Sequence, residues 1–315
     1  MPHAPREGQT IAGAGRLARY VNLVKLPHTV FALPFALVGA TLASDVAPVS
    51  PSAIAWIVVA FTCARFAAMG FNRIADREID ARNPRTSARE LPAGVMGVGQ
   101  AAVAVVIASA LFVVAAARLN ALCGWLSPLA LGWVFFYSYT KRFTRWSHGV
   151  LGLSLAIAPV GGYLAIAGGW SVPWWMLMAL AAAVAAWVAG FDILYALQDR
   201  TVDLAQGLHS IPVAFGTRGA FRISRALHLL SIAALIAVGW ATSAGVLYGI
   251  GVTVAAALLL YEHSLVSPGD LARLDAAFFT MNGIISITFF TFVLADRLVR
   301  IWHATGGRPG GPGSP

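Results

Sequence analysis

Charged residues are scarce in this sequence of 315 residues: Asp, Glu, Lys and Arg together make up 11%, whereas 58% of the residues are hydrophobic. Soluble globular domains carry about 25% charged residues, so this composition excludes that class. The mean hydropathy of +0.74 and apolar stretches of helix length indicate an all-α integral membrane protein. The alternating segments of about ten residues that are typical of an outer-membrane barrel do not occur.

Cysteine is also scarce. Cys63 and Cys123 both lie in apolar stretches, which indicates small buried side chains and gives no sign of a disulfide framework or zinc site. Acidic residues are fewer than basic ones, and the formal net charge is +9. The Lys and Arg residues are dispersed among the polar connections, which is typical of topology determinants. We therefore expect no nucleic-acid partner.

Apolar stretches of spanning length predict about nine transmembrane helices, at residues 23–43, 52–71, 96–117, 121–139, 149–168, 172–192, 226–242, 243–262 and 276–296. The first stretch exceeds the core of a signal peptide, which has about 7–15 residues, so we expect it to be retained. Residues 1–20 are expected to form a basic N-terminal segment, residues 21–300 the membrane domain, and residues 301–315 a disordered tail.

The distribution of Lys and Arg predicts the orientation in the membrane. Basic residues are concentrated in alternate connections, so the positive-inside rule places segments 72–94 and 192–216 on the cytoplasmic side of the inner membrane. The loop at 44–51 then lies on the other side. With nine spans, Arg297, Arg300 and Arg308 of the C-terminal segment lie on the non-cytoplasmic side, which disagrees with the positive-inside rule.

The acidic residues are unevenly distributed along the chain. Seven of the 13 lie in the two segments 72–94 and 192–216. Each segment follows an apolar stretch, carries acids at helical spacing and ends in a loop with Pro and Gly. This shared plan predicts two similar four-helix halves, each contributing one acidic segment.

The first acidic segment places Asn72, Asp76 and Asp80 at i, i+4 and i+8, so that on a helix three oxygen-bearing side chains share one face. Neighbouring carboxylates repel unless a cation lies between them. Mg²⁺ takes one or two such carboxylates and completes its shell with water and substrate phosphate. The second segment repeats the theme with Asp192, Tyr195, Asp199 and Asp203.

An alternative for either segment is a solvated helix whose acids form ion pairs with the interleaved Arg73, Arg77 and Arg82. Two clusters of similar design on one side of the membrane favour a metal site, because ionisable groups at the membrane are expensive and usually functional.

Basic and aromatic residues accompany the acids. Arg65 lies within the second apolar stretch on the same helical face as Asn72 and Asp76, where it can meet a diphosphate or a carboxylate; the alternative is a snorkelling arginine. Tyr139, Lys141 and Arg142 end the fourth stretch. They are either interfacial anchors or the lining of a diphosphate site.

The pattern Asn72-x3-Asp76-x3-Asp80, followed by Arg85-Thr86-x2-Arg89-x-Leu91-Pro92-x-Gly94 and later by Tyr195-x3-Asp199-x3-Asp203, resembles the UbiA superfamily of intramembrane prenyltransferases. The residues at 137–143 and 191–199 are similar to the bacterial 4-hydroxybenzoate polyprenyltransferase group, in particular to its branch in menaquinone synthesis through futalosine. The resemblance implies a nine-helix bundle, Mg²⁺ as cofactor and a polyprenyl diphosphate donor. The implied acceptor is an aromatic carboxylate, either 4-hydroxybenzoate or 1,4-dihydroxy-6-naphthoate.

The resemblance also implies the roles of residues. Catalytic and metal-binding roles fall to Asp76, Asp80, Asp199 and Asp203, with Asn72 as a further metal ligand. We expect the substrates to contact Asn72, Arg65, Tyr139, Lys141, Arg142, Asp192 and Tyr195. A secondary transporter is the non-enzyme alternative. The acids lie beyond the ends of the apolar stretches and not at their centres, which favours the enzyme.

Overall fold

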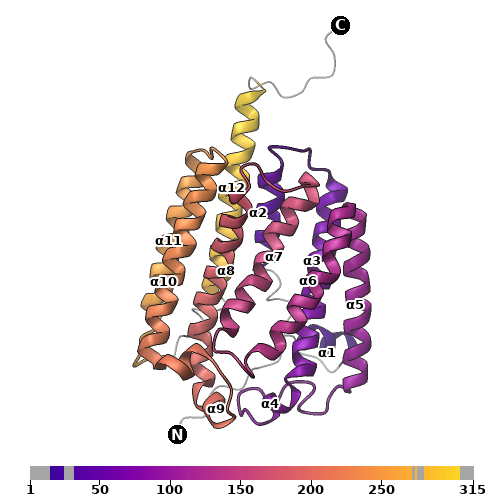
Figure 1. The fold of residues 1–315 in the computed structure, drawn as a ribbon, viewed down its shortest axis with the longest axis vertical. Helices are drawn as coiled ribbons and strands as arrows, with labels where there is room; N and C mark the ends of the chain where they lie inside the picture. Colours follow the sequence, from indigo (N-terminus) through magenta and orange to yellow (C-terminus); the bar gives the residue numbers. More distant parts are fainter. Residues whose placement is uncertain (1–14, 25–31, 272–273, 275–279, 306–315) are drawn as a thin grey trace.

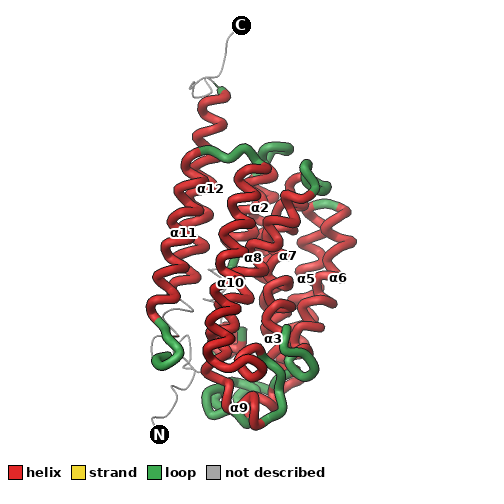
Figure 2. Tube along the Cα trace, turned by 60° about the vertical axis from the view of Figure 1, so that its left-hand side comes forward, coloured by secondary structure: helices red, strands yellow, loops and turns green. Residues whose placement is uncertain are grey.

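The computed structural model describes residues 15–24, 32–271, 274 and 280–305. Within these residues the chain forms helices and loops, and its β-pairing is limited to an isolated bridge between Ser267 and Asp270. Figure 2 shows the same organisation, with long helices joined by loops at both ends of the bundle. The expected all-α class is confirmed.

The described helices follow one another along the chain as shown in Figure 1. They are α1 (Arg16–Leu23), α2 (Leu33–Ala43), α3 (Pro51–Ala75), α4 (Arg77–Ala81), α5 (Val98–Leu119), α6 (Ala121–Thr140), α7 (Ser147–Ala167), α8 (Trp175–Tyr195), the 3-10 helix η2 (Ala196–Asp199), α9 (Arg200–Ala205), α10 (Ile211–Ala241), α11 (Val246–Leu265) and α12 (Asn282–Ala304).

Seven segments of the described chain are long and apolar enough to cross a membrane, which makes this a multi-pass membrane protein. They are α3, α5, α6, α7, the segment from α8 to α9, α10 and α11. The expected count of nine is not confirmed. Of the first predicted stretch, 23–43, residues 25–31 lie outside the described residues. Its described part contains α2 with 11 residues, a length of about 16 Å against a hydrocarbon core of about 30 Å.

The helix α10 is longer than the apolar stretch 226–242 that predicts it. It begins at Ile211, where the Ser210 hydroxyl accepts a hydrogen bond from the Val213 N–H at 3.3 Å. Gly216 interrupts the helix with φ 66° and ψ 179°, values that favour glycine. Three arginines on the added turns lower the local hydropathy, so the apolar pattern reveals only the second half of this helix.

Each acidic segment follows a helix that packs along the next long helix: α3 lies against α5, and α8 lies against α10. The helix α7 contacts both α2 and α8. Glycines bring α2 and α7 together, because a Cβ on Gly39 would lie 1.9 Å from the Pro159 carbonyl oxygen and one on Gly162 would lie 2.0 Å from that of Ala36. These close approaches hold α2 against α7, and α7 in turn packs on α8, which leads into the second acidic segment.

The two ends of the bundle differ in their polar contacts. The upper end in Figure 1 carries α12, whose Arg297 pairs with Asp45 and donates to the Ser44 hydroxyl at 2.7 Å. The helix continues to Ala304, four residues into the expected disordered tail, while residues 306–315 and 1–14 lie outside the described residues. The lower end gathers α1, α4 and α9. The acidic segments therefore share one end of the bundle.

Candidate active site

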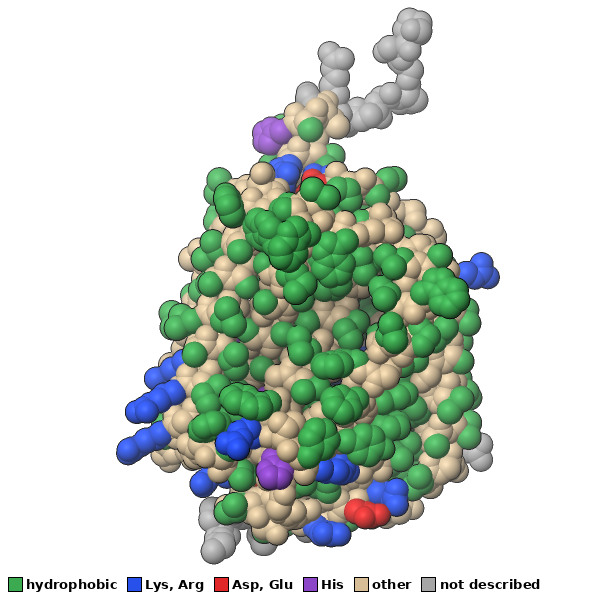
Figure 3. Space-filling model, viewed as in Figure 1, with side chains coloured by type: hydrophobic (Ala, Val, Ile, Leu, Met, Phe, Trp, Pro, Cys, Tyr) green, Lys and Arg blue, Asp and Glu red, His purple; other side chains and the backbone are tan. Residues whose placement is uncertain are grey.

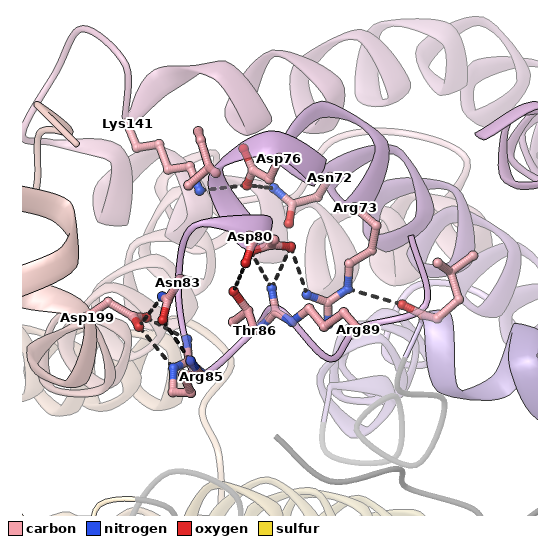
Figure 4. A network of polar contacts seen from close by, with 12 residues as sticks. Asn72, Arg73, Asp76, Asp80, Asn83, Arg85, Thr86, Arg89, Lys141 and Asp199 are labelled. Carbon is pink, nitrogen blue, oxygen red and sulfur yellow. Dashed lines mark hydrogen bonds and ion pairs between the residues drawn. The ribbon is translucent and has the colours of Figure 1, made fainter. Parts of the chain in front are cut away.

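Asp76 lies at the end of α3 and is surrounded by donors. Its side chain is 5% exposed, and its carboxylate accepts from Lys141 Nζ at 2.7 Å and from Arg142 NH2 at 3.1 Å. The Asn72 amide donates to the same carboxylate at 3.1 Å. Figure 4 shows Lys141 and Asn72 on either side of Asp76. The structure thus joins four predicted site residues from two separate segments.

Asp80 lies on α4 and has its own set of partners. The backbone departs from helical geometry at Asp76, with φ −96° and ψ 3°, so α3 and α4 are separate helices and the continuous acidic face predicted from i, i+4, i+8 spacing is interrupted. Arg89 NH1 contacts both Asp80 carboxylate oxygens at 2.8 Å, and Arg73 NH1 lies 3.8 Å away. The Thr86 hydroxyl donates to the Asp80 carbonyl at 3.0 Å.

The second acidic segment is also broken into pieces, since α8 ends at Tyr195 and η2 separates it from α9. Asp199 accepts from Arg85 Nε at 2.9 Å and from Arg85 NH2 at 2.5 Å. The Asn83 amide donates to Asp199 at 2.8 Å. The Tyr195 hydroxyl accepts from Arg85 NH1 at 3.1 Å. Two loops that are distant in sequence therefore meet at Asp199 (Figure 4).

Further contacts tie three loops together at this end. The Gln206 amide donates to the Ile79 carbonyl at 3.3 Å, and the His209 N–H donates to the Lys141 carbonyl at 2.8 Å. Asp203 on α9 lies close enough to Asp199 and Lys141 for their charges to act on it. The first acidic segment, the second one and the α6–α7 loop thus form one polar site.

Asp192 lies one turn above Tyr195 on α8 and contacts His148. The distance from His148 Nδ1 to the Asp192 carboxylate is 2.7 Å, and the Ile211 N–H donates to His148 Nε2 at 3.4 Å. With Nε2 as an acceptor, Nδ1 carries the proton that Asp192 accepts. The structure thus places His148 against a predicted substrate-binding residue.

Aromatic side chains lie beside the cluster around Asp76. The ring of Tyr139 is 6.0 Å from Phe71, which stacks on Phe135 at 4.3 Å. The Arg142 guanidinium lies 5.1 Å from the Tyr139 ring centre. Arg65 is half-buried on α3, 11 residues before Asp76, which corresponds to about 16 Å along a helix.

Cations lie directly against the acids of the site. Arg73, Arg85, Arg89, Lys141 and Arg142 all contact the carboxylates of Asp76, Asp80 and Asp199. Asp192 and Asp203 lie in the same segments, so the five cations balance five carboxylates. The guanidinium and ammonium groups offer partners to an anionic substrate at the end of a membrane bundle.

Comparison with known proteins shows the family of this chain. The profile of the UbiA prenyltransferase family matches residues 32–284, which include both acidic segments. The chain belongs to the UbiA prenyltransferase family. The resemblance drawn from the motifs is confirmed, and with it the expectation of an aromatic prenyltransferase of the 4-hydroxybenzoate polyprenyltransferase type.

Individual UbiA-family relatives match most of the chain. The 4-hydroxybenzoate octaprenyltransferase of Nitrosospira multiformis is 30% identical over 291 residues, which cover 90% of this chain and 97% of the relative. The apo structure of a UbiA homologue from Aeropyrum pernix K1 is 32% identical, with a TM-score of 0.78 over 86% of this chain and 98% of that one. A UbiA homologue from Archaeoglobus fulgidus, solved with DMAPP and Mg²⁺, shares the fold at 20% identity, with a TM-score of 0.70 over 89% of this chain and 99% of that one.

The side chains of the candidate site suit Mg²⁺ by their chemistry, because Asp and Asn oxygens are the hard ligands that this ion prefers. Within the described residues no three His, Cys, Asp or Glu side chains converge closely enough to hold a metal on their own. A site built on pairs of these oxygens needs substrate phosphate and water to complete the shell, as Mg²⁺ usually does. The donor set therefore fits the metal when a phosphorylated substrate is present.

Several residues of the candidate site were not predicted as site residues from the sequence. Asn83, Arg85, Thr86 and Arg89 come from the loop after α4, and Asn83, Arg85 and Thr86 are buried. The sequence shows that these residues lie in a loop with Pro and Gly, but it does not show that their side chains contact Asp80 and Asp199. The sequence signal for them is a set of polar residues in a loop that directly follows an acidic segment.

Proposed function

We propose that this enzyme transfers a polyprenyl chain from polyprenyl diphosphate to 4-hydroxybenzoate, an aromatic carboxylate that serves as a quinone precursor. The observation that carries the proposal is that both acidic segments meet a cluster of cations at one end of a membrane bundle. The match to a 4-hydroxybenzoate octaprenyltransferase along 97% of its length supports the acceptor.

The donor's diphosphate is proposed to bind among the cations of the three loops. Lys141 and Arg142 are 30% and 32% exposed at the side chain, so they can reach a ligand while they remain near Asp76. Arg85 offers a planar guanidinium of the kind that binds phosphate in a two-pronged manner. The polyprenyl chain then extends into the bilayer, which accounts for the membrane setting.

Asp76, Asp80, Asp199 and Asp203 are proposed as the catalytic carboxylates, with Asn72 as a further oxygen ligand for Mg²⁺. When bound, Mg²⁺ would supply Lewis-acid neutralisation of the diphosphate as the C–O bond of the donor breaks. The surrounding cations keep the carboxylates together and hold the leaving group. The Archaeoglobus fulgidus homologue has the same fold and was solved with DMAPP and Mg²⁺, which supports this proposal.

The acceptor is proposed to bind deeper in the bundle. Loss of diphosphate leaves an allylic cation, which the ring faces of Tyr139 and Tyr195 can stabilise. A ring carbon of the acceptor attacks this cation, the new C–C bond forms, and the ring proton is lost. Arg65 is proposed to hold the acceptor carboxylate, and Asp192, positioned by His148, to contact the substrate.

The runner-up acceptor is 1,4-dihydroxy-6-naphthoate, which the resemblance to the futalosine branch favours. Incubation of the purified enzyme with a long-chain prenyl diphosphate, Mg²⁺ and each acceptor, followed by mass spectrometry, decides between them. We expect a prenylated product from 4-hydroxybenzoate. If only 1,4-dihydroxy-6-naphthoate is prenylated, it is the acceptor in place of 4-hydroxybenzoate. If neither compound is prenylated, the proposal is refuted.

The inner membrane is the proposed location, with the acidic loops on its cytoplasmic face. The Lys and Arg content of the alternate connections supports this orientation. Polyprenyl diphosphate and the aromatic carboxylate would then enter from the bilayer and from the cytoplasm respectively.

A further inference from the structure

The first half of α10 carries three arginines that the proposed reaction does not use. Arg218, Arg222 and Arg225 are spaced i, i+4 and i+7, so they share one face of the helix, and all three are exposed. We call these three residues the arginine face. Figure 3 shows Lys and Arg side chains projecting from the lower left flank, where Figure 1 draws the lower part of α10.

The arginine face points away from the bundle. Ala220, Phe221 and Ser224, on the other side of the same turns, are 0%, 3% and 0% exposed. Within the described residues no carboxylate forms an ion pair with any of the three arginines. The arginine face is therefore directed at the surroundings of the protein and not at the active site.

The exposed surface of α10 changes from charged to apolar immediately above the arginine face. Leu229, one turn after Arg225, is 71% exposed, and Ile236 and Trp240 are 59% and 80% exposed. From Arg218 to Trp240 a helix rises about 33 Å, close to the thickness of a hydrocarbon core of about 30 Å. Since tryptophan marks one membrane interface, the arginine face lies at the other one, at the level of the lipid headgroups.

Neighbouring aromatic residues mark the same level. The ring of Phe215 lies 6.3 Å from that of Trp146, and both side chains are exposed. The Arg145 guanidinium lies 5.9 Å from the Phe215 ring centre. Exposed aromatic rings beside arginines are typical of a membrane–water interface, so the surface combines apolar anchoring with positive charge.

We propose that the arginine face is a binding surface for anionic phospholipid, whose phosphate groups the three guanidinium groups contact. Guanidinium groups bind phosphate oxygens in pairs, and basic residues at a membrane surface are attracted to anionic headgroups. Bound lipid would hold the first half of α10 and so the loop before it, which includes Ser210 and adjoins Asp203 on α9. This inference does not depend on the identity of the prenyl acceptor.

Thermal unfolding of the purified protein in neutral detergent, with added phosphatidylglycerol or phosphatidylcholine, tests the proposal. We expect phosphatidylglycerol to raise the Tm of the natural protein, and phosphatidylcholine to leave it unchanged. The variant Arg218→Gln/Arg222→Gln/Arg225→Gln should need roughly a hundredfold more phosphatidylglycerol for the same rise, because each of the three arginines contributes about fivefold to the affinity. Its turnover in phosphatidylcholine should match that of the natural protein.

Arg118→Gln is the matched control, because Arg118 is an exposed arginine at the other end of the bundle, at the end of α5. This variant should keep the full response to phosphatidylglycerol. If the triple variant fails to fold, the single variant Arg222→Gln and a NaCl titration of the natural protein replace it; both should weaken the response, since salt screens exposed charges.

Three outcomes would overturn the proposal. The triple variant could keep the natural response, phosphatidylcholine could raise the Tm as much as phosphatidylglycerol does, or inorganic phosphate alone could reproduce the whole effect. The last outcome would indicate a site for free anions. Failure of prenyl transfer with an intact lipid response would leave this inference standing and refute only the proposed function.

Discussion

Arg85 contacts Asp199, 114 residues later in the chain, through two nitrogen atoms: Nε lies 2.9 Å from one carboxylate oxygen and NH2 lies 2.5 Å from the other. The same guanidinium donates to the Tyr195 hydroxyl at 3.1 Å and lies 5.3 Å from its ring centre. Together with Asn83, this side chain ties the first loop to the second acidic segment. The two acidic segments are therefore linked through an arginine of the first and a carboxylate of the second, not through a pair of carboxylates.

The first prediction concerns this contact. Arg85→Met should lower kcat/KM at least hundredfold, because it leaves the partly buried Asp199 carboxylate without its main partner and separates the two loops. Steady-state kinetics in proteoliposomes measures the loss. Arg85→Lys should recover only part of it, since an ammonium group cannot make the two-pronged contact.

Arg82→Gln is the control for Arg85, because Arg82 is an exposed arginine at the start of the same loop. It should retain kcat/KM within about threefold, as surface substitutions usually have small effects. Equal losses in the Arg82 and Arg85 variants would mean that general positive charge, and not the Arg85–Asp199 contact, supports the reaction.

The second prediction concerns the competition for Asp76. Lys141 Nζ lies 2.7 Å from the carboxylate that is also a proposed metal ligand. Lys141→Met should therefore raise the affinity for Mg²⁺ alone by roughly fivefold, the worth of a partly exposed ion pair. The affinity for a non-hydrolysable prenyl diphosphate should fall, because the diphosphate loses a cation. The two affinities are expected to change in opposite directions only if Lys141 both neutralises Asp76 and binds the diphosphate.

Isothermal titration calorimetry with Mg²⁺ alone, and then with the diphosphate analogue in excess Mg²⁺, measures both affinities. Arg145→Gln supplies a matched control, since Arg145 is an exposed cation on the same loop and has Phe215, not Asp76, as its neighbour. A parallel fall of both affinities in the Lys141 variant would show that Lys141 only supports the fold of the loop.

The third prediction concerns the contribution of Asp80 to stability. Removal of an acid from a crowded acidic face would relieve repulsion, but Asp80 is held by Arg89 and Arg73 and its side chain is 8% exposed. Asp80→Ala removes the buried carboxylate that both arginines contact and should lower the free energy of unfolding by about 3 kcal/mol. Glu78→Ala, two residues away with 70% of its side chain exposed, should have little effect. Equal Tm values for the two variants would refute the structural role of Asp80.

The contrast at Asp80 illustrates what the sequence could and could not predict about the site. The spacing of Asp76, Asp80, Asp199 and Asp203 indicated two acidic segments, and the structure brings these segments together. The partners were not visible, because Arg85 and Asp199 are 114 residues apart and nothing local relates them. The break at Asp76 depends on how α4 packs in the folded bundle, and helical spacing carries no information about that.

The fold was predictable where apolar residues are continuous. α5, α6 and α7 begin and end within two residues of the predicted stretches. α10 was predicted only in part, because Arg218, Arg222 and Arg225 lower the hydropathy of its first half while the opposite side of the same turns is buried. Hydropathy averages over all faces of a helix, so a helix that lies at the membrane interface with one face buried is underestimated.

The orientation in the membrane is the basis of the last prediction. Figure 1 draws the acidic loops and the upper loops at opposite ends of the bundle, so a label at each end reports on opposite sides of the membrane. Thr86 is 1% exposed and would react poorly, whereas Ser87 is exposed on the acidic loop. At the other end Val46 is 63% exposed. Ser87→Cys and Val46→Cys are therefore the pair of reporters that the structure favours.

In this fourth prediction each reporter is placed in a background with Cys63→Ala and Cys123→Ala, because both natural cysteines lie in the spanning helices α3 and α6. A membrane-impermeant maleimide added to intact cells should label position 46 quickly and position 87 only after the membrane is opened, since the basic connections lie on the cytoplasmic side. Labelling of both positions in opened membranes controls for their reactivity. Faster labelling at position 87 in intact cells would reverse the orientation and place the diphosphate site on the outer side.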